Sequence, residues 1–164
     1  MQKAVFSLAT IMLLAVSFLP AQTSKTYCNN RFGFCLNYPD KLSPSEEAPI
    51  NSDGIILQAP DGVQVSVSGS YNVMDWTPEK IFEFTKADFA GVIGAEASIL
   101  ENESTGKGFE ALLSSGTYYQ YAQMVTKGDV YLILTVTGPA ELLEDMKTLR
   151  QQLKLTFDHA TEGQ

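Results

Sequence analysis

The chain has 164 residues, with 11 lysines and arginines against 19 aspartates and glutamates, and a formal net charge of −8. Its length is that of a single domain, and a hydrophobic content of 45% is enough for a packed core. The negative charge argues against binding to nucleic acid, whose phosphates attract basic patches, and against binding to anionic membrane surfaces.

The N-terminal segment predicts a secretory signal peptide over 1–21. Lys3 gives it a short positive start, an uncharged and mostly apolar run follows, and Pro20-Ala21 closes it. We expect cleavage after Ala21, which leaves Gln22 as the first residue of a periplasmic or secreted protein without a stable membrane span. The alternative is an uncleaved N-terminal anchor.

The only two cysteines, Cys28 and Cys35, lie in the stretch YCNNRFGFCLNYP. Turn-forming residues separate them, and a hairpin centred between Arg31 and Phe32 places the two cysteines directly opposite each other. In an oxidising compartment this arrangement predicts a cross-strand disulfide. Two cysteines cannot complete a structural zinc site, and their spacing is not that of a CxxC redox motif.

A loop and a hairpin are predicted next. The range 39–53 contains three prolines and little periodicity, which indicates a loop. Strands beginning at Ile55 and Val63 flank the turn residues Pro60-Asp61-Gly62. The second strand alternates valine with glutamine and serine, which indicates one buried face and one wetter face.

A helix is predicted to open at Trp76-Thr77-Pro78, because Thr77 can cap it and Pro78 suits its first position. We expect Trp76 to pack on Ile81 rather than to stack on a ligand. Asp88 lies within the apolar arc, either at its margin or as a buried acid, and the margin is favoured. The arc itself is expected to be one broad buried face made of Ile81, Phe82, Phe84, Thr85, Phe89 and Val92.

Glycines at 91 and 94 are expected to end this helix. A strand over 97–101, a turn over 101–108 and a strand over 109–114 are predicted to follow.

The range 117–157 predicts a strand, a tight turn, a second strand and a helix. The strand Tyr118–Thr126 would pair antiparallel with a long apolar strand from Val130, across the turn residues Lys127-Gly128-Asp129. The second strand is apolar on both faces over much of its length, which is typical of a central strand. After Pro139 an apolar helical stripe, expected to fold back onto the sheet, is formed by Leu142, Met146, Leu149 and Leu153.

Three tyrosines, Tyr118, Tyr119 and Tyr121, place aromatic rings on both faces of one strand. Tyrosine combines a large apolar ring with a polar tip, which suits interfaces and the rims of pockets. We hypothesise that at least one of the three borders a partner or ligand surface. The alternative is that all three cover the sheet beneath a helix.

No catalytic residue, metal site or cofactor site is predicted. The only histidine, His159, lies in a polar tail over 159–164 that we expect to be mobile, so a Ser-His-Asp or Cys-His site would have no credible base. There is no GxGxxG and no phosphate-binding loop. Scattered carboxylates could bind a divalent ion weakly, but a solvated acidic surface is the favoured interpretation.

The order of elements resembles the PsbP/Mog1-like superfamily, including exported bacterial PsbP-like and DcrB-like proteins. The matching stretches are FGFCLNYP at 32–39, SDGIILQAPDGVQVSVSG at 52–69 and YYQYAQMVTKGDVYLILTVTGP at 118–139. The resemblance implies a single domain over 22–158 of the α+β class, with an antiparallel sheet flanked by helices on both faces. No functional residue is carried over, because the resemblance includes no shared site motif.

The resemblance also implies a non-enzymatic accessory or binding protein of the bacterial cell envelope, since family members are largely of that kind. Its partner would be another envelope protein or a small apolar ligand. The alternative is a carboxylate-dependent hydrolase acting on an envelope polymer, which would need two converging acids in a cleft.

Overall fold

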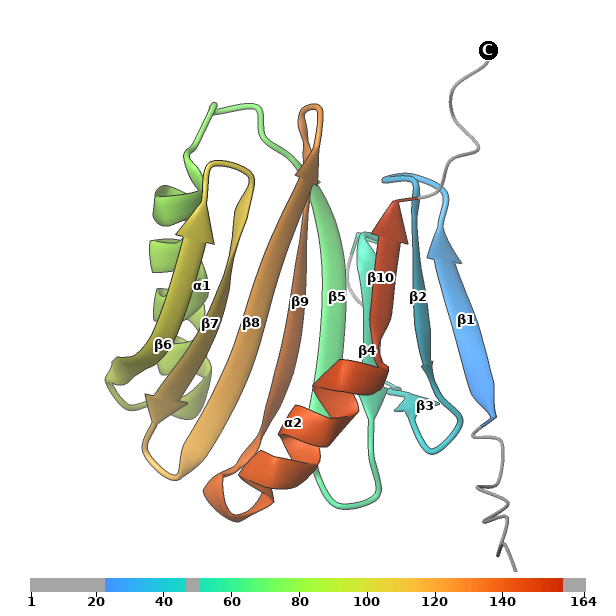
Figure 1. The fold of residues 1–164 in the computed structure, drawn as a ribbon, viewed down its shortest axis with the longest axis vertical. Helices are drawn as coiled ribbons and strands as arrows, with labels where there is room; N and C mark the ends of the chain where they lie inside the picture. Colours follow the sequence, from blue (N-terminus) through green and yellow to red (C-terminus); the bar gives the residue numbers. More distant parts are fainter. Residues whose placement is uncertain (1–22, 47–50, 158–164) are drawn as a thin grey trace, which may run out of the picture.

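The computed structural model describes residues 23–46 and 51–157, which form two antiparallel sheets and two α-helices (Figure 1). The signal peptide over 1–21, the tail over 159–164 and part of the predicted 39–53 loop lie outside the described residues. The larger sheet has seven strands, in the spatial order β3 (Ser43–Pro44), β4 (Gly54–Gln58), β5 (Gln64–Tyr71), β9 (Val130–Pro139), β8 (Tyr118–Lys127), β7 (Gly108–Ser115) and β6 (Ala97–Thr105).

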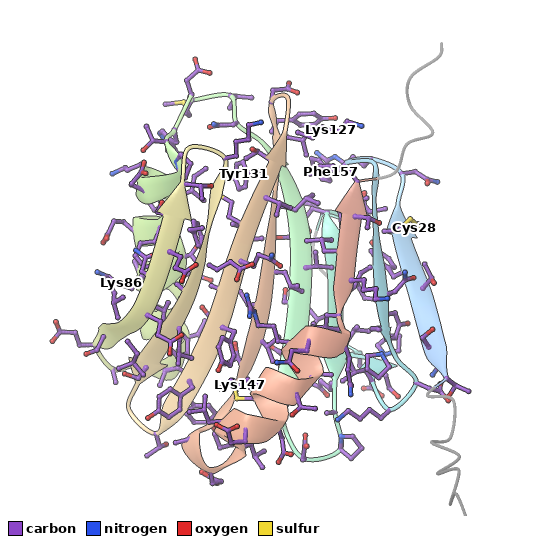
Figure 2. All side chains as sticks on the ribbon, in the orientation of Figure 1. Cys28, Lys86, Lys127, Tyr131, Lys147 and Phe157 are labelled. Carbon is purple, nitrogen blue, oxygen red and sulfur yellow. A yellow bond between two sulfur atoms is a disulfide. The ribbon has the colours of Figure 1, made fainter. Side chains whose placement is uncertain are left out.

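A smaller sheet is built from the two ends of the described chain. It has three strands in the order β1 (Ser24–Asn29), β2 (Phe34–Pro39) and β10 (Lys154–Phe157). Cys28 lies opposite Cys35 in the β1–β2 pair and is joined to it by a disulfide, as the hairpin predicted. Figure 2 shows Cys28 on β1, the outer strand of this sheet.

The first hydrophobic core lies between the small sheet, helix α2 (Leu143–Gln152) and one face of the large sheet. Strand alternation sends Val65 and Val67 of β5 into this core together with Leu134 of β9. Met146 and Leu149 of α2 are buried in this core and cover it on the helical side. This confirms that the last helix docks on the sheet. The helix begins later than predicted, because Pro139 still belongs to β9 and a 3₁₀ turn over 140–142 intervenes.

The second core lies on the opposite face of the large sheet, beneath helix α1 (Pro78–Ile93). Thr77 caps this helix by accepting a hydrogen bond from the Lys80 amide, and Pro78 occupies the first turn. Gly94 ends it with a φ of 76°, a conformation that favours glycine. α1 packs on β6, β7 and β8, whereas α2 lies on the other side of the sheet in Figure 1. The predicted arrangement, an antiparallel sheet with helices on both faces, is therefore confirmed.

Two strand predictions need correction. The turn expected over 101–108 is limited to Gly106 and Lys107, because β6 continues to Thr105. Almost every side chain of β6 is exposed, so this edge strand is held in the sheet by its backbone pairing with β7. For the same reason polar residues are tolerated along it. The loop expected over 39–53 contains the short strand β3, which pairs with β4. In the described part of the chain, no helix is long and apolar enough to cross a membrane.

Candidate functional site

The most developed cavity of the described residues is a groove of about 580 Å³ beside α1. It exists because α1 covers β6, β7 and β8 and leaves the adjoining face of β5 and β9 open. The groove therefore has a sheet floor and a helical wall. Its volume falls in the usual range for small-ligand pockets, roughly 300–1,000 Å³.

The floor of the groove is a ladder of hydroxyl groups. On β5, Ser66, Ser68 and Ser70 alternate with the valines of the first core, so their side chains point to the opposite face. Ser66 is paired with Thr135 of β9, and the next serine along is paired with Ile133. Among the described residues, none of the three serine side chains has a hydrogen-bond partner in the protein. This is the wetter face that the valine–serine alternation predicted.

The wall of the groove is a stripe of α1 at a spacing of four residues, formed by Phe84, Asp88 and Val92. Phe84 is 46% exposed and Val92 is 77% exposed, so the prediction that both lie on the buried face of α1 is wrong. The physical reason is that the open half of the sheet offers this side of the helix nothing to pack against. Asp88 is exposed at the margin of the arc, as expected.

Aromatic rings close one end of the groove. Trp76 stacks on Phe84, with 4.6 Å between the ring centres and an interplanar angle of 24°. Lys80 places its ammonium 4.9 Å from the centre of the Phe84 ring. Tyr131, labelled in Figure 2, lines the groove from β9. The ring contact of Trp76 is thus with Phe84, whereas sequence analysis expected packing on Ile81, which lines the same groove.

Gln120 of β8 is the buried polar residue of the groove. It is only 8% exposed, and its Nε2 donates a hydrogen bond to Oγ1 of Thr137 at 3.0 Å. Its Oε1 is buried and has no hydrogen-bond partner in the described structure. A buried acceptor without a donor costs about 1–3 kcal/mol, so a ligand that donates a hydrogen bond here would recover that cost.

The three tyrosines selected from the sequence lie elsewhere. Tyr118 is 38% exposed and shares a face of β8 with Gln120, but it does not line the groove. Tyr119 and Tyr121 are half-buried on the opposite face, packed against the first core. Burial is the main cause that raises the pKa of Tyr121, and the negative charges of Glu101 and Glu144 add to it, whereas Lys147 and Arg150 lower it. The strand therefore divides the tyrosines between two surfaces.

A second hollow lies beside Tyr121 and is lined by acidic residues of β6 and β7. Glu103 of β6 is directly opposite Glu110 of β7, and Glu101 lies in the same hollow. Arg150 of α2 forms an ion pair with Glu110. All three carboxylates are exposed to water, and in the described ranges no group of three metal-binding side chains is found.

The groove could not be identified from the sequence. Its serines were recognised as a wetter face, but Gln120 was not selected, because a glutamine between tyrosines carries no motif. The one available signal was the width of the apolar arc of α1, which is broader than the contact that one helix makes with a sheet. Phe84 and Val92 are the residues of the arc that lie beyond this contact.

These features define an α+β sandwich of the PsbP/Mog1 type, with a groove between one helix and an open part of its sheet. The structure is similar to cyanobacterial PsbP (CyanoP) from Synechocystis sp. PCC 6803, with a TM-score of 0.58, 12% identity, and 85% of this chain and 96% of that chain covered. It is also similar to the Ran-binding protein Mog1p of Saccharomyces cerevisiae, with a TM-score of 0.59, 9% identity, and 82% and 96% covered. The resemblance seen in the sequence is thus confirmed at the level of the fold.

No family model matches the chain. A curated protein of Caenorhabditis elegans, a probable cleavage and polyadenylation specificity factor subunit 1, is 28% identical over 119 residues. The match includes 72% of this chain but only 8% of that protein. The chain therefore spans a small part of this relative.

Proposed function

We propose that the protein is a non-enzymatic binding protein, exported to the cell envelope as a periplasmic or secreted accessory protein, and that the groove beside α1 is its binding site. The buried and unpaired Oε1 of Gln120 is the observation that carries this proposal. A folded protein that keeps a buried acceptor unpaired at the bottom of an open groove is suited to a partner that supplies the donor.

The distribution of acids supports a binding protein over a carboxylate-dependent hydrolase. Such a hydrolase needs two carboxyl groups facing each other across its substrate. Asp88 is the single carboxylate that lines the groove. The acidic hollow contains Glu103 and Glu110 opposite each other on neighbouring strands, and both side chains are exposed to water.

Export is supported by the signal-peptide pattern of 1–21 and by the disulfide between Cys28 and Cys35, which suits an oxidising compartment. A protein partner is supported by Mog1p, which is named as a Ran-binding protein and shares the fold. The partner we propose is an envelope protein or a small ligand with an apolar part.

A second contact surface stays a proposal. Tyr118 is exposed on β8, and Tyr121 lies beside Arg150 in the acidic hollow. Either tyrosine would border a partner bound at the sheet outside the groove. Tyr119 belongs to the same hypothesis, as the neighbour of Tyr121 on one face of the strand.

The test is photocrosslinking from two matched positions. Val92 lies in the groove and is 77% exposed, and Val73 lies outside it and is 82% exposed. Benzoylphenylalanine is placed at each position in turn in the full chain, and adducts formed in cells of the source organism are identified by mass. We expect an adduct from position 92 and none from position 73. Equal adducts from both positions, or none from position 92, contradict the groove as the binding site.

The same method tests the tyrosines. Benzoylphenylalanine at positions 118, 119 and 121 is compared with position 73. A specific adduct from one of the three supports the second surface, and its absence from all three removes these tyrosines from the function.

A further inference from the structure

We infer that the ligand of the groove is a neutral saccharide of more than one ring, held by Gln120 at one end of the groove, by the hydroxyl ladder along its floor and by the aromatic rings at its other end. Gln120 is opposite Thr137 of β9 and the aromatic end contains Tyr131, six residues away on the same strand, which is roughly 20 Å. This inference rests on the proposed binding function of the groove and names the chemical class of its ligand. It follows from three properties of the lining: hydrogen-bonding groups, aromatic faces and charge.

The hydrogen-bonding groups of the floor match a ligand rich in hydroxyls. A sugar hydroxyl both donates and accepts, and so do the hydroxyls of Ser66, Ser68 and Thr135 that line the floor. The unpaired Oε1 of Gln120 accepts only, and a sugar hydroxyl can supply its donor. A purely apolar ligand would strip water from this floor without replacing those hydrogen bonds, which is costly.

The aromatic end of the groove matches the faces of a sugar ring. A pyranose carries its hydroxyls around its edge and presents C–H groups on its faces, so it can lie flat on an aromatic ring. Phe84 is 46% exposed although Trp76 stacks on it and the Lys80 ammonium lies 4.9 Å from its ring centre, so the part of the ring that these two neighbours leave uncovered is available to a ligand. Tyr131 and Ile133 add further apolar contact from β9. Polar groups on one side and rings on the other are what a ring with polar edges requires.

The charges of the groove select against an anion. Asp88 is the only charged side chain in its lining, and the chain has a formal net charge of −8. Neither phosphate nor a carboxylated ligand finds a cation within the lining to pair with, since Lys80 lies outside the lining, beside the Phe84 ring. The ligand is therefore neutral, and its binding is insensitive to salt.

An extended peptide strand is a poorer occupant. Strand addition requires a free edge, and the strands that form the floor are paired on both sides, β5 with β4 and β9, and β9 with β5 and β8. A peptide lying across the floor would place its backbone on side chains rather than on a hydrogen-bonding edge. The sheet face thus favours a ligand that binds to side chains over one that pairs with a backbone edge.

The experiment is a titration of the isotope-labelled protein followed by amide chemical shifts. The probes are glucose, N-acetylglucosamine, maltose and chitobiose as neutral saccharides, glucuronate as an anion, and 1-octanol as an apolar ligand. We expect at least one neutral saccharide to shift the resonances of β5, β9 and Phe84 at millimolar concentration. Glucuronate is expected to leave them in place.

Two variants and one control test the residues. Gln120→Leu removes the unpaired acceptor, and Phe84→Ala removes the exposed ring. Each variant is expected to lower the affinity for the saccharide about tenfold, which is the effect of losing one hydrogen bond or one ring contact. Ile99→Ala is the control, because Ile99 is 45% exposed on β6 and lies outside the groove. It is expected to leave the affinity unchanged. Unchanged affinity in both groove variants overturns the inference.

The failure of this inference and of the proposed function can be told apart. If 1-octanol shifts the groove resonances and no saccharide does, the inferred class of ligand is wrong and the groove remains a binding site. If no probe shifts them and position 92 gives no crosslink, both proposals are overturned.

Discussion

Arg150, in the last turn of α2, lies with its guanidinium carbon 5.6 Å from the centre of the Tyr121 ring on β8. The same guanidinium forms an ion pair with Glu110 of β7. A cation close to an aromatic ring is attracted to its face. Arg150 therefore ties the end of α2 to two strands of the large sheet.

We predict that Arg150→Ala lowers the free energy of unfolding by about 1 kcal/mol, because a partly exposed ion pair and a cation–π contact are each worth about 0.5–1 kcal/mol and act through one side chain. Urea unfolding followed by circular dichroism measures it. Gln151→Ala, at an exposed residue of the same helix, is the control and is expected to be neutral. Equal stability of the two variants would show that the contact contributes nothing.

Tyr121 makes stability sensitive to alkaline pH. Burial foremost raises its pKa in the folded protein, so folding favours the neutral phenol. That contribution is fully present below the unfolded pKa of about 10 and is lost as pH rises through the folded pKa. We predict that Tyr121→Phe loses less stability than the wild type between about pH 9 and about pH 11. Urea titrations at both pH values test it, with Tyr118→Phe, at an exposed tyrosine, as the control.

The docking of α2 depends on Leu149, which is 2% exposed in the first core. Leu149→Ala should cost about 2–5 kcal/mol, and Leu149→Asp should cost more, because it buries a charge without a partner. Glu144→Ala, on the exposed side of the same helix, should change stability by less than about 0.5 kcal/mol. Thermal unfolding distinguishes the three, and equal melting temperatures for Leu149→Asp and Glu144→Ala would refute the docking.

The disulfide between Cys28 and Cys35 holds the hairpin at the outer edge of the small sheet. We predict that replacing both cysteines by serine lowers the free energy of unfolding by about 2–3 kcal/mol, as expected for a loop of this length. Ser24→Ala, at an exposed residue of the same strand, is the control and is expected to change the free energy of unfolding by less than about 0.5 kcal/mol.

The same disulfide provides a test of export. Mass spectrometry of the protein recovered from cells should show a chain that starts near Gln22 and contains no thiol available for alkylation. Two alkylated cysteines in the native protein would argue against an oxidising compartment.

Elements with local signals were predictable from the sequence. Thr77, Pro78 and Gly94 mark both ends of α1, because capping depends only on neighbouring residues. The hairpin of β8 and β9 has a glycine turn between two strands of clear alternation. The register of Cys28 with Cys35 follows from the turn alone.

Elements that depend on distant partners were not predictable. β10 has four residues and directly follows a helix, so only its pairing with β2 makes it a strand. The polar second half of β6 has no apolar period, and its pairing with β7 determines its structure.

The candidate site was missed for a related reason. Capping and periodicity determine where α1 begins and ends, but not which strands it covers. The helix lies over β6, β7 and β8 and leaves β5 and β9 uncovered. Phe84 and Val92, which were expected in the core, therefore form the wall of a groove. Gln120 becomes a site residue only because the groove opens above it.

The pairing of β10 with β2 has a consequence for the order of folding. The Thr156 hydroxyl donates a hydrogen bond to the carbonyl of Cys35, 121 residues away in sequence, so the small sheet is completed only by the last of the described strands. Contacts between residues so far apart form late, since the intervening chain must be ordered before they gain free energy. During synthesis the N-terminus leaves the ribosome first, so one edge of β2 stays unpaired until the residues of β10, up to Phe157, have been added. A product that ends before Lys154 keeps that edge permanently, and an unpaired edge of this kind is a template for aggregation.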